Sequence, residues 1–285
     1  MSVVVNSNVT SLIAQRSLGN NVDNLRQVFQ RLSTGSKINS AKDDAAGLSI
    51  SEKLRMNIKG YDKAIANTKD GANALKIADS GFESMVSNLQ RIRELCVQGA
   101  NGTYSSSERT YILNEIKQRL TDFNQTVSST SFNGTPLLNG SVVNLRIQTG
   151  AGTNLTTNTI DIAAAFTGQS LTVTGLGLDS ALTATGTTWG PTTIRTYMDA
   201  IDTGLNKLLG ARSKIGGMMN RLDSVLSNLG SMQENLQSSD STIRDSDIAK
   251  ETADMTRYQI LQQASTQVLS QVNQLPSMAL KLLGG

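Results

Sequence analysis

Apolar residues recur every seventh position near both ends of the chain, with others four places further on. They are Leu18, Val22, Leu25, Phe29 and Leu32 near the N-terminus, and Leu261, Val268, Val272, Leu275 and Leu282 near the C-terminus. This spacing is typical of one apolar seam along an α-helix. A lone seam cannot bury itself, so we expect the two terminal helices to pair. An ordinary core stripe would show the same spacing, and the pattern alone favours neither interpretation.

The segment after the first helix contains two adjacent carboxylates. We expect that helix to begin between Ser7 and Thr10 and to end at Gly35, in a stretch of helix breakers. Asp43 and Asp44 could indicate a metal or acid–base site. A role at the start of a helix is the stronger interpretation, because adjacent helical side chains point in different directions and aspartate is favoured in a first turn.

The middle of the chain is predicted to contain two long helices and a shorter one between them. Apolar steps of four and three predict a helix from Leu54 to about Gln98, with Cys96 on its buried face. The Ser105–Glu108 pair reads as a capping box, opening a second helix that returns antiparallel. Helix resumes near Pro191 and continues to Leu236 with Arg212 in its one polar slot. We expect a joint at residues 238–241 before the final helix.

The segment between these helices differs in composition. The dipeptides Asn133-Gly134 and Asn139-Gly140 predict turns. Alternation at Val143, Leu145 and Ile147, followed by a stretch rich in Thr, Gly and Asn, predicts a small β-containing insert over residues 141–190. The predicted fold class is therefore mainly α: a long antiparallel coiled-coil or helical-rod hairpin with paired N- and C-terminal helices and a small central insert.

Composition excludes several kinds of chemistry. The chain has 285 residues, no histidine, one cysteine and only 4% aromatic residues, with a net charge of +3. Histidine-based triads and metal sites, internal disulfides and cysteine clusters are therefore excluded. No apolar run is long enough to span a membrane, no cleavable secretory signal is visible, and no basic run with aromatics indicates nucleic-acid binding. We expect no cofactor, no enzymatic activity and no membrane insertion.

Several segments, in order, resemble the bacterial flagellin family. They are residues 31–48 (RLSTGSKINSAKDDAAGL), 89–95 (LQRIREL), 131–134 (SFNG), 243–247 (IRDSD), 256–264 (TRYQILQQA) and 273–276 (NQLP). The resemblance covers roughly residues 1–150 and 195–285. The middle is not recognisable, which is typical of the hypervariable region of that family.

The resemblance implies a structural subunit that polymerises into the flagellar filament used for motility. Residues 1–40 and 242–285 would form the inner core, residues 41–140 and 191–241 the outer core with a short β-hairpin, and residues 141–190 the variable surface. It also implies unfolded export by the flagellar type III apparatus without a cleaved signal, and an extracellular location. The implied partners are other copies of the chain, an export chaperone, and the filament cap and hook–filament junction proteins. Burial of one apolar seam offsets only a small part of the conformational entropy lost when a terminal segment becomes helical. We therefore expect these terminal segments, the arms, to be disordered in the free subunit.

The resemblance further implies recognition by the vertebrate flagellin-sensing Toll-like receptor. The residues carried over by position are Gln90, Arg91, Ile92, Arg93, Glu94, Leu95, Val97 and Glu115. Arg91 and Glu115 would make charged contacts around an apolar Leu95 anchor, and a Leu95→Ala monomer should signal more weakly. Subunit packing is the stronger explanation for why these residues are present.

Two alternative functions stay open at this point. A hook–filament junction protein would share the helical ends, although residues 42–47 and 256–264 favour a flagellin. A secreted helical translocator with amphipathic arms is disfavoured by the Gln- and Ser-rich polar faces, and liposome leakage would reveal it.

Overall fold

The computed structural model describes residues 8–140, 144–166 and 171–283, with side chains described as far as Gln274. The chain divides into two compact units. One combines the chain up to Met56 with the part from Asn235 onward, and the other spans Asn57–Glu234. Long helices dominate both units, which confirms the predicted mainly α fold.

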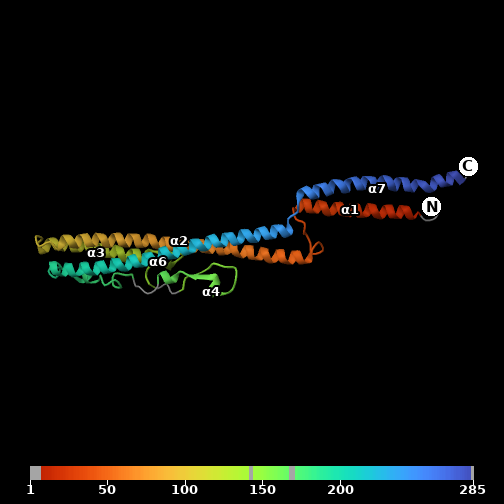
Figure 1. Cartoon of the computed structure of the whole chain (residues 1–285). Helices are drawn as coiled ribbons and strands as arrows, with labels where there is room; N and C mark the ends of the chain where they lie inside the picture. Colours follow the sequence, from red (N-terminus) through yellow and green to blue (C-terminus); the bar gives the residue numbers. More distant parts are fainter. Residues whose placement is uncertain (1–7, 141–143, 167–170, 284–285) are drawn as a thin grey trace. The chain divides into compact units, whose positions relative to one another are not determined.

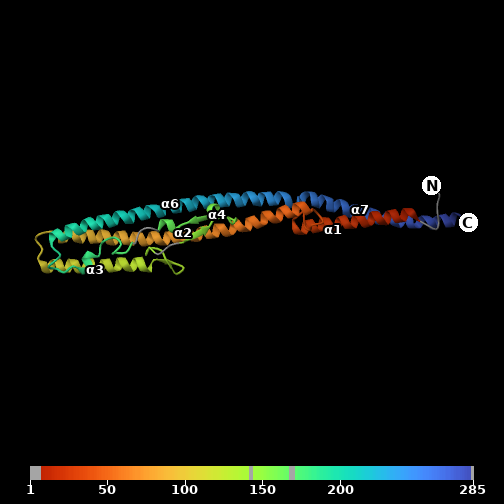
Figure 2. The same cartoon turned by 90° about the horizontal axis from the view of Figure 1, so that it is seen from below.

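In the first unit, α1 (Val9–Thr34) lies antiparallel beside α7 (Ile248–Leu283), as Figures 1 and 2 show. The Asn8 side chain caps α1 by accepting a hydrogen bond from the Ser11 amide at 3.0 Å. The helix stops at Gly35, whose φ of 70° is in the left-handed region that favours glycine. Both the pairing of the terminal helices and this stop are therefore confirmed.

The joint between the last two long helices lies later than expected. Helix α6 (Pro191–Arg244) continues through residues 238–241, where the Ser239 hydroxyl donates to the Asn235 carbonyl one turn earlier at 2.8 Å. The chain leaves the helix only at Asp245, which forms a β-bridge with Ser36. The Ser246 amide donates to the Gly35 carbonyl at 2.9 Å. The prediction of a joint at 238–241 is therefore wrong.

Helix α2 (Ala45–Gly99) starts earlier than the expected Leu54. Asp44 accepts a hydrogen bond from the Gly47 amide at 2.9 Å, and this N-terminal cap lies upstream of the first strong apolar periodicity. Helix α2 also contributes to both units, as α6 does, because the unit boundary falls within each helix.

In the second unit, α2 and α6 lie alongside α3 (Ser106–Ser129). The predicted capping box is present: the Ser105 amide donates to Glu108 Oε2 at 2.7 Å, and the Glu108 amide donates to Ser105 Oγ at 3.3 Å. The hydrogen bond from the Ser105 amide holds the pKa of Glu108 below its ordinary value. Helix α6 begins at Pro191, as expected.

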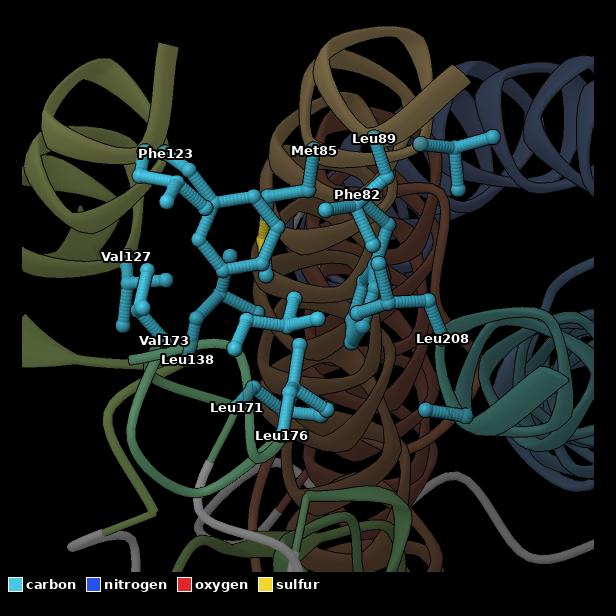
Figure 3. Close-up of a cluster of buried hydrophobic side chains, with 14 of the residues drawn as sticks. Phe82, Met85, Leu89, Phe123, Val127, Leu138, Leu171, Val173, Leu176 and Leu208 are labelled. Carbon is cyan, nitrogen blue, oxygen red and sulfur yellow. The ribbon is translucent and has the colours of Figure 1, made fainter. Parts of the chain in front are cut away.

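The core of this unit is built from aliphatic and a few aromatic side chains of all three helices and the insert. Figure 3 shows part of it: Phe82, Met85, Leu89, Phe123, Val127, Leu138, Leu171, Val173, Leu176 and Leu208. Cys96 is fully buried in the same core, and burial raises the pKa of its thiol to about 12. The expectation that Cys96 is a buried apolar residue is confirmed.

Two short hairpins account for the described strands. Strands β1 (Ser131–Phe132) and β2 (Thr135–Pro136) pair across a turn in which Asn133 and Gly134 both have positive φ. This confirms the turn predicted there.

Strands β3 (Arg146–Gln148) and β4 (Thr159–Asp161) pair antiparallel, with Ile147 opposite Ile160. Val143, from the expected alternation, lies outside the described residues. Leu171 and Val173 do not form a strand; both are buried in the core. Short turns complete the insert: α4 (Leu155–Asn158), η1 (Ala163–Ala165) and α5 (Ser180–Thr183).

Candidate assembly surface

The interface between α1 and α7 is thin and partly polar. Asn8 Nδ2 donates to the Val272 carbonyl at 3.1 Å, and Asn21 Nδ2 donates to Ser265 Oγ at 3.1 Å. The half-buried Arg31 pairs with Glu251 at 3.3 Å near the other end. These bonds fix the register of the pair, but among the described apolar side chains of the two helices only Val28 is fully buried, and the others stay partly exposed.

The predicted seam is only partly the interface that the two helices form. Leu18, Val22, Leu25, Leu32 and Val272 are half-buried, as expected. Phe29, Leu261 and Val268 are 48%, 41% and 51% exposed, so placing them in the seam between α1 and α7 was wrong. The side chains of Leu275 and Leu282 lie outside those described.

The physical reason is the register of α7. The bond from Asn21 places Ser265 against α1, and the half-buried positions on that face are Tyr258, Gln262, Ser265, Leu269 and Val272. Leu261 and Val268 each precede one of these positions by one residue, which is about 100° around a helix. The heptad of apolar residues therefore marks a face beside the interface.

Both terminal helices also carry a set of large apolar side chains that the α1–α7 pairing leaves exposed. Its members are Val9, Leu12, Ile13, Phe29, Ile260, Leu261 and Val268, each at least 41% exposed. We call these residues the outer arm surface. Exposed apolar side chains in this number on two adjoining helices indicate a protein-binding surface rather than a solvated face.

The paired aspartates have structural roles. Asp43 accepts hydrogen bonds from the backbone amides of Asn39 at 3.1 Å and Ser40 at 2.9 Å, and these bonds lower the pKa of Asp43. Asp44 caps α2. Across the described residues, no group of three histidine, cysteine, aspartate or glutamate side chains is arranged to hold a metal ion. The structural interpretation of Asp43 and Asp44 is favoured.

The segment carried over for receptor recognition lies on α2 in the second unit. Arg91 bonds Glu94 at 3.0 Å and Glu115 of α3 at 3.3 Å, and all three side chains reach the surface. Arg93 pairs with Asp202 of α6 at 2.6 Å. Leu95, only 2% exposed, and the fully buried Ile92 belong to the core, so the expected apolar Leu95 anchor is wrong.

The exposed part of this segment forms a shallow depression. Gln90, Arg93, Glu94 and Val97 line a space of about 440 Å³, and Val97 is 52% exposed. Helix geometry explains why Val97 is exposed and Leu95 is not. Leu95 follows Ile92 by three positions and therefore shares its buried face, whereas Val97 lies on another face.

The sequence alone did not identify two buried polar residues near the joint. Ser51 is fully buried on α2 and donates to Asp240 of α6 at 2.5 Å. Glu251 is 6% exposed at the start of α7, where it pairs with Arg31. Both are polar residues within polar stretches, so apolar periodicity could not have found them.

None of the described helices combines the length and apolar character needed to cross a membrane. Comparison with known families matches the bacterial flagellin N-terminal helical region to residues 5–143 and the bacterial flagellin C-terminal helical region to residues 198–283.

Relatives match over nearly the whole chain. A flagellar filament 33 kDa core protein of Treponema phagedenis is 34% identical, covering 99% of this chain and 100% of the relative. A flagellin of Halalkalibacterium halodurans is 36% identical with the same coverage. A solved structure from Vibrio parahaemolyticus, described as a flagellar hook-associated protein, is similar with a TM-score of 0.56 and 17% identity, over 71% of this chain and 100% of that one. This last likeness shows the fold alone.

Proposed function

The chain belongs to the bacterial flagellin family, and we propose that it polymerises through the outer arm surface of α1 and α7. It is a structural subunit of the flagellar filament and not an enzyme. The single observation that carries the proposed surface is the exposure of large apolar side chains on both arms, from Leu12 at 62% to Leu261 at 41%. Burial of such side chains drives association between proteins.

We assign three layers of the filament to three parts of the chain. Residues 1–40 and 242–285 form the inner core, residues 41–140 and 191–241 the outer core, and residues 141–190 the variable outer face. The thin α1–α7 interface supports the first assignment, because a pair that buries so little by itself gains most from covering by neighbouring copies.

A hook–filament junction protein is the alternative from the same superfamily. The likeness to a hook-associated structure shows only a shared fold, at 17% identity. Relatives that match 99% of this chain are named as flagellin or filament core proteins. These names favour the filament subunit.

Family membership supports the remaining roles that we propose. The subunit would be exported unfolded by the flagellar type III apparatus, held beforehand by a chaperone on its C-terminal segment, and assembled beneath the filament cap onto the junction proteins. It would then lie outside the cell and serve motility.

The test is polymerisation of the purified protein. Sedimentation and electron microscopy before and after addition of ammonium sulfate should show monomers converting to long uniform filaments. Removing residues 1–34 or residues 248–285 should abolish filaments. A full-length chain that stays monomeric, or truncated chains that still polymerise, would overturn the proposed surface.

We also propose that the monomer binds the vertebrate flagellin-sensing Toll-like receptor through the exposed face around Arg91 and Glu115. Their ion pair at 3.3 Å and the neighbouring exposed Val97 support a charged contact with an apolar centre. Arg91→Glu should reduce receptor signalling by the monomer, and Arg221→Glu, an equal charge change at an exposed arginine elsewhere, should not. Equal signalling by both variants would contradict the proposal.

A further inference from the structure

Acidic residues recur at an interval of seven on α3: Glu108, Glu115 and Asp122. Residues seven apart lie within about 20° of each other around a helix, so these carboxylates follow one side of α3. Arg119 lies on the same side but forms no ion pair among the described residues, which leaves an excess of negative charge there. Tyr111 lies between the first two carboxylates and is 74% exposed, more than any other large apolar side chain that the structure describes. We call this side of α3 the acidic face.

Basic residues recur at the same interval on α6: Lys207, Lys214 and Arg221. No acidic residue of α6 lies between Asp202 and Asp223, so no carboxylate of the same helix interrupts this stripe. None of the three cations forms an ion pair or a side-chain hydrogen bond within the described part of the chain. We call this side of α6 the basic face, and its three charges are available to another molecule.

Gly210 and Gly217, also seven residues apart, lie beside the basic face. An added Cβ at either position would meet nothing within 4 Å, and neither glycine has a positive φ. Glycine inside a helix lowers helix stability relative to alanine, and neither packing within the chain nor backbone conformation requires it here. A hollow of about 320 Å³ lies at Gly217, and its lining includes Lys214 and Arg221. Both observations indicate space for a second helix to approach the backbone of α6 closely.

The two faces complement each other in charge and in spacing. Figure 2 shows that α3 and α6 both run antiparallel to α2, so they run parallel to each other. A copy that is shifted without being inverted would therefore bring its α3 alongside α6 in the same direction. The three carboxylates would then meet the three cations in order, since both sets have the same spacing. A contact between two different surfaces can continue from copy to copy and builds an open filament.

We propose that the acidic face of one copy docks on the basic face of a neighbouring copy in the filament. This inference rests on the proposed polymerisation and adds a charged contact between the second units to the apolar contact between the arms. Tyr111 is the anchor of this contact, because an exposed aromatic ring offers both apolar area and a partner for a lysine ammonium group. Gly210 and Gly217 let α3 lie close enough for the cations of α6 to reach its carboxylates.

Charge reversals on the two helices test the contact. Arg221→Glu places a negative charge on the basic face, and Asp122→Arg places a positive charge on the acidic face. Each variant should raise the critical concentration for seeded growth about fivefold at low salt, and the increase should shrink at 1 M salt. An equimolar mixture of the two variants should grow close to the native value, because a reversed basic face then meets a reversed acidic face.

The matched controls are Lys63→Glu and Asp70→Arg, at exposed positions of α2 outside both faces. They should change the critical concentration by less than about twofold. Reversed variants that grow like these controls would overturn the inference and leave polymerisation intact. A defect that the mixture does not restore would also overturn it, because the damage would then lie within each chain. Native protein that forms no filaments would overturn the proposed function together with this contact.

Gly217→Ala separates assembly from folding. This substitution should raise the melting temperature of the monomer, because alanine favours the helix, and should also raise the critical concentration about threefold by filling space that a neighbouring copy uses. Gly216→Ala is the matched control, since its added Cβ also meets nothing within 4 Å but lies about 100° around the helix. It should raise the melting temperature and leave the critical concentration unchanged. Equal critical concentrations for the two variants would contradict the contact.

Discussion

Arg212 of α6 and Asp79 of α2 form a two-point ion pair: Nε donates to Oδ1 at 2.7 Å and Nη2 donates to Oδ2 at 3.2 Å. Both side chains are about one-third exposed, at 36% and 34%. Arg212 fills the one polar slot that interrupts the apolar stripe of α6. The pair therefore sets the register of α6 against α2 at a point where apolar packing is missing.

Asp79→Asn should destabilise the second unit. The two-point geometry makes this pair stronger than an ordinary surface ion pair, but partial exposure limits the loss to about 1 kcal/mol of unfolding free energy. Urea unfolding of the monomer measures the loss. Asp70→Asn, at an exposed aspartate without an ion pair among the described residues, is the control and should change the unfolding free energy by less than about 0.5 kcal/mol. Equal effects of the two substitutions would show that the pair contributes nothing specific.

Cys96 should make stability depend on pH in the alkaline range. Burial raises the pKa of its thiol to about 12, whereas the pKa in an unfolded chain is about 8.5. Above pH 8.5 the unfolded chain loses the thiol proton and the folded chain keeps it, so folding stability falls with rising pH. Relative to Cys96→Ala, the native protein should lose about 1.4 kcal/mol per pH unit as pH approaches 10.

Urea unfolding of both proteins between pH 8 and pH 10 provides this comparison, and because the two proteins share their tyrosines, tyrosine ionisation near pH 10 cancels in the difference. Parallel stability curves for the two proteins would refute the assignment. The same burial predicts that Cys96 in the folded monomer reacts with a thiol reagent only after denaturation.

Replacing glycine with alanine should lower the folding stability at one position of the second unit and raise it at another. Gly134 occupies the hairpin turn with φ of 78°, so Gly134→Ala should cost about 1 kcal/mol. Gly210 lies exposed within α6, and an added Cβ there would meet nothing within 4 Å. Gly210→Ala should therefore stabilise the unit by about 1 kcal/mol. Thermal melting of the two variant monomers should show a lower melting temperature for Gly134→Ala and a higher one for Gly210→Ala. A shift in the same direction for both variants would refute the argument.

Long-range organisation was predictable where apolar periodicity was strong. The stripe that includes Phe82, Leu89 and Cys96 predicted α2 as far as its end, and Gly35 and the Ser105–Glu108 pair predicted where helices end and begin. These features depend on local spacing and on backbone chemistry, both of which can be read directly from a sequence.

The joint and the exact faces of the arms could not be predicted in the same way. The break at Asp245 depends on a β-bridge to Ser36, which lies far away in the sequence. The exposure of Val268 depends on the register that Asn21 and Ser265 fix by a hydrogen bond between the two arms. The family resemblance aligns Leu95 with a contact position but carries no information about burial, and Leu95 is only 2% exposed.

The outer arm surface yields the most direct prediction about assembly. Phe29 and Val268 are about half exposed, so replacing either with serine should leave the α1–α7 pair intact and weaken its covering by neighbouring copies. Losing the burial of one such side chain costs about 1.5 kcal/mol, which corresponds to about a tenfold rise in the critical concentration. Gln27→Ser, at an exposed polar position on the same helix, is the control and should change it little. Seeded growth measured over a range of subunit concentrations gives the value for each variant. If Phe29→Ser and Val268→Ser grow at the same critical concentration as Gln27→Ser, these side chains remain solvent-exposed in the filament, and the contacts between copies must use another face of the arms.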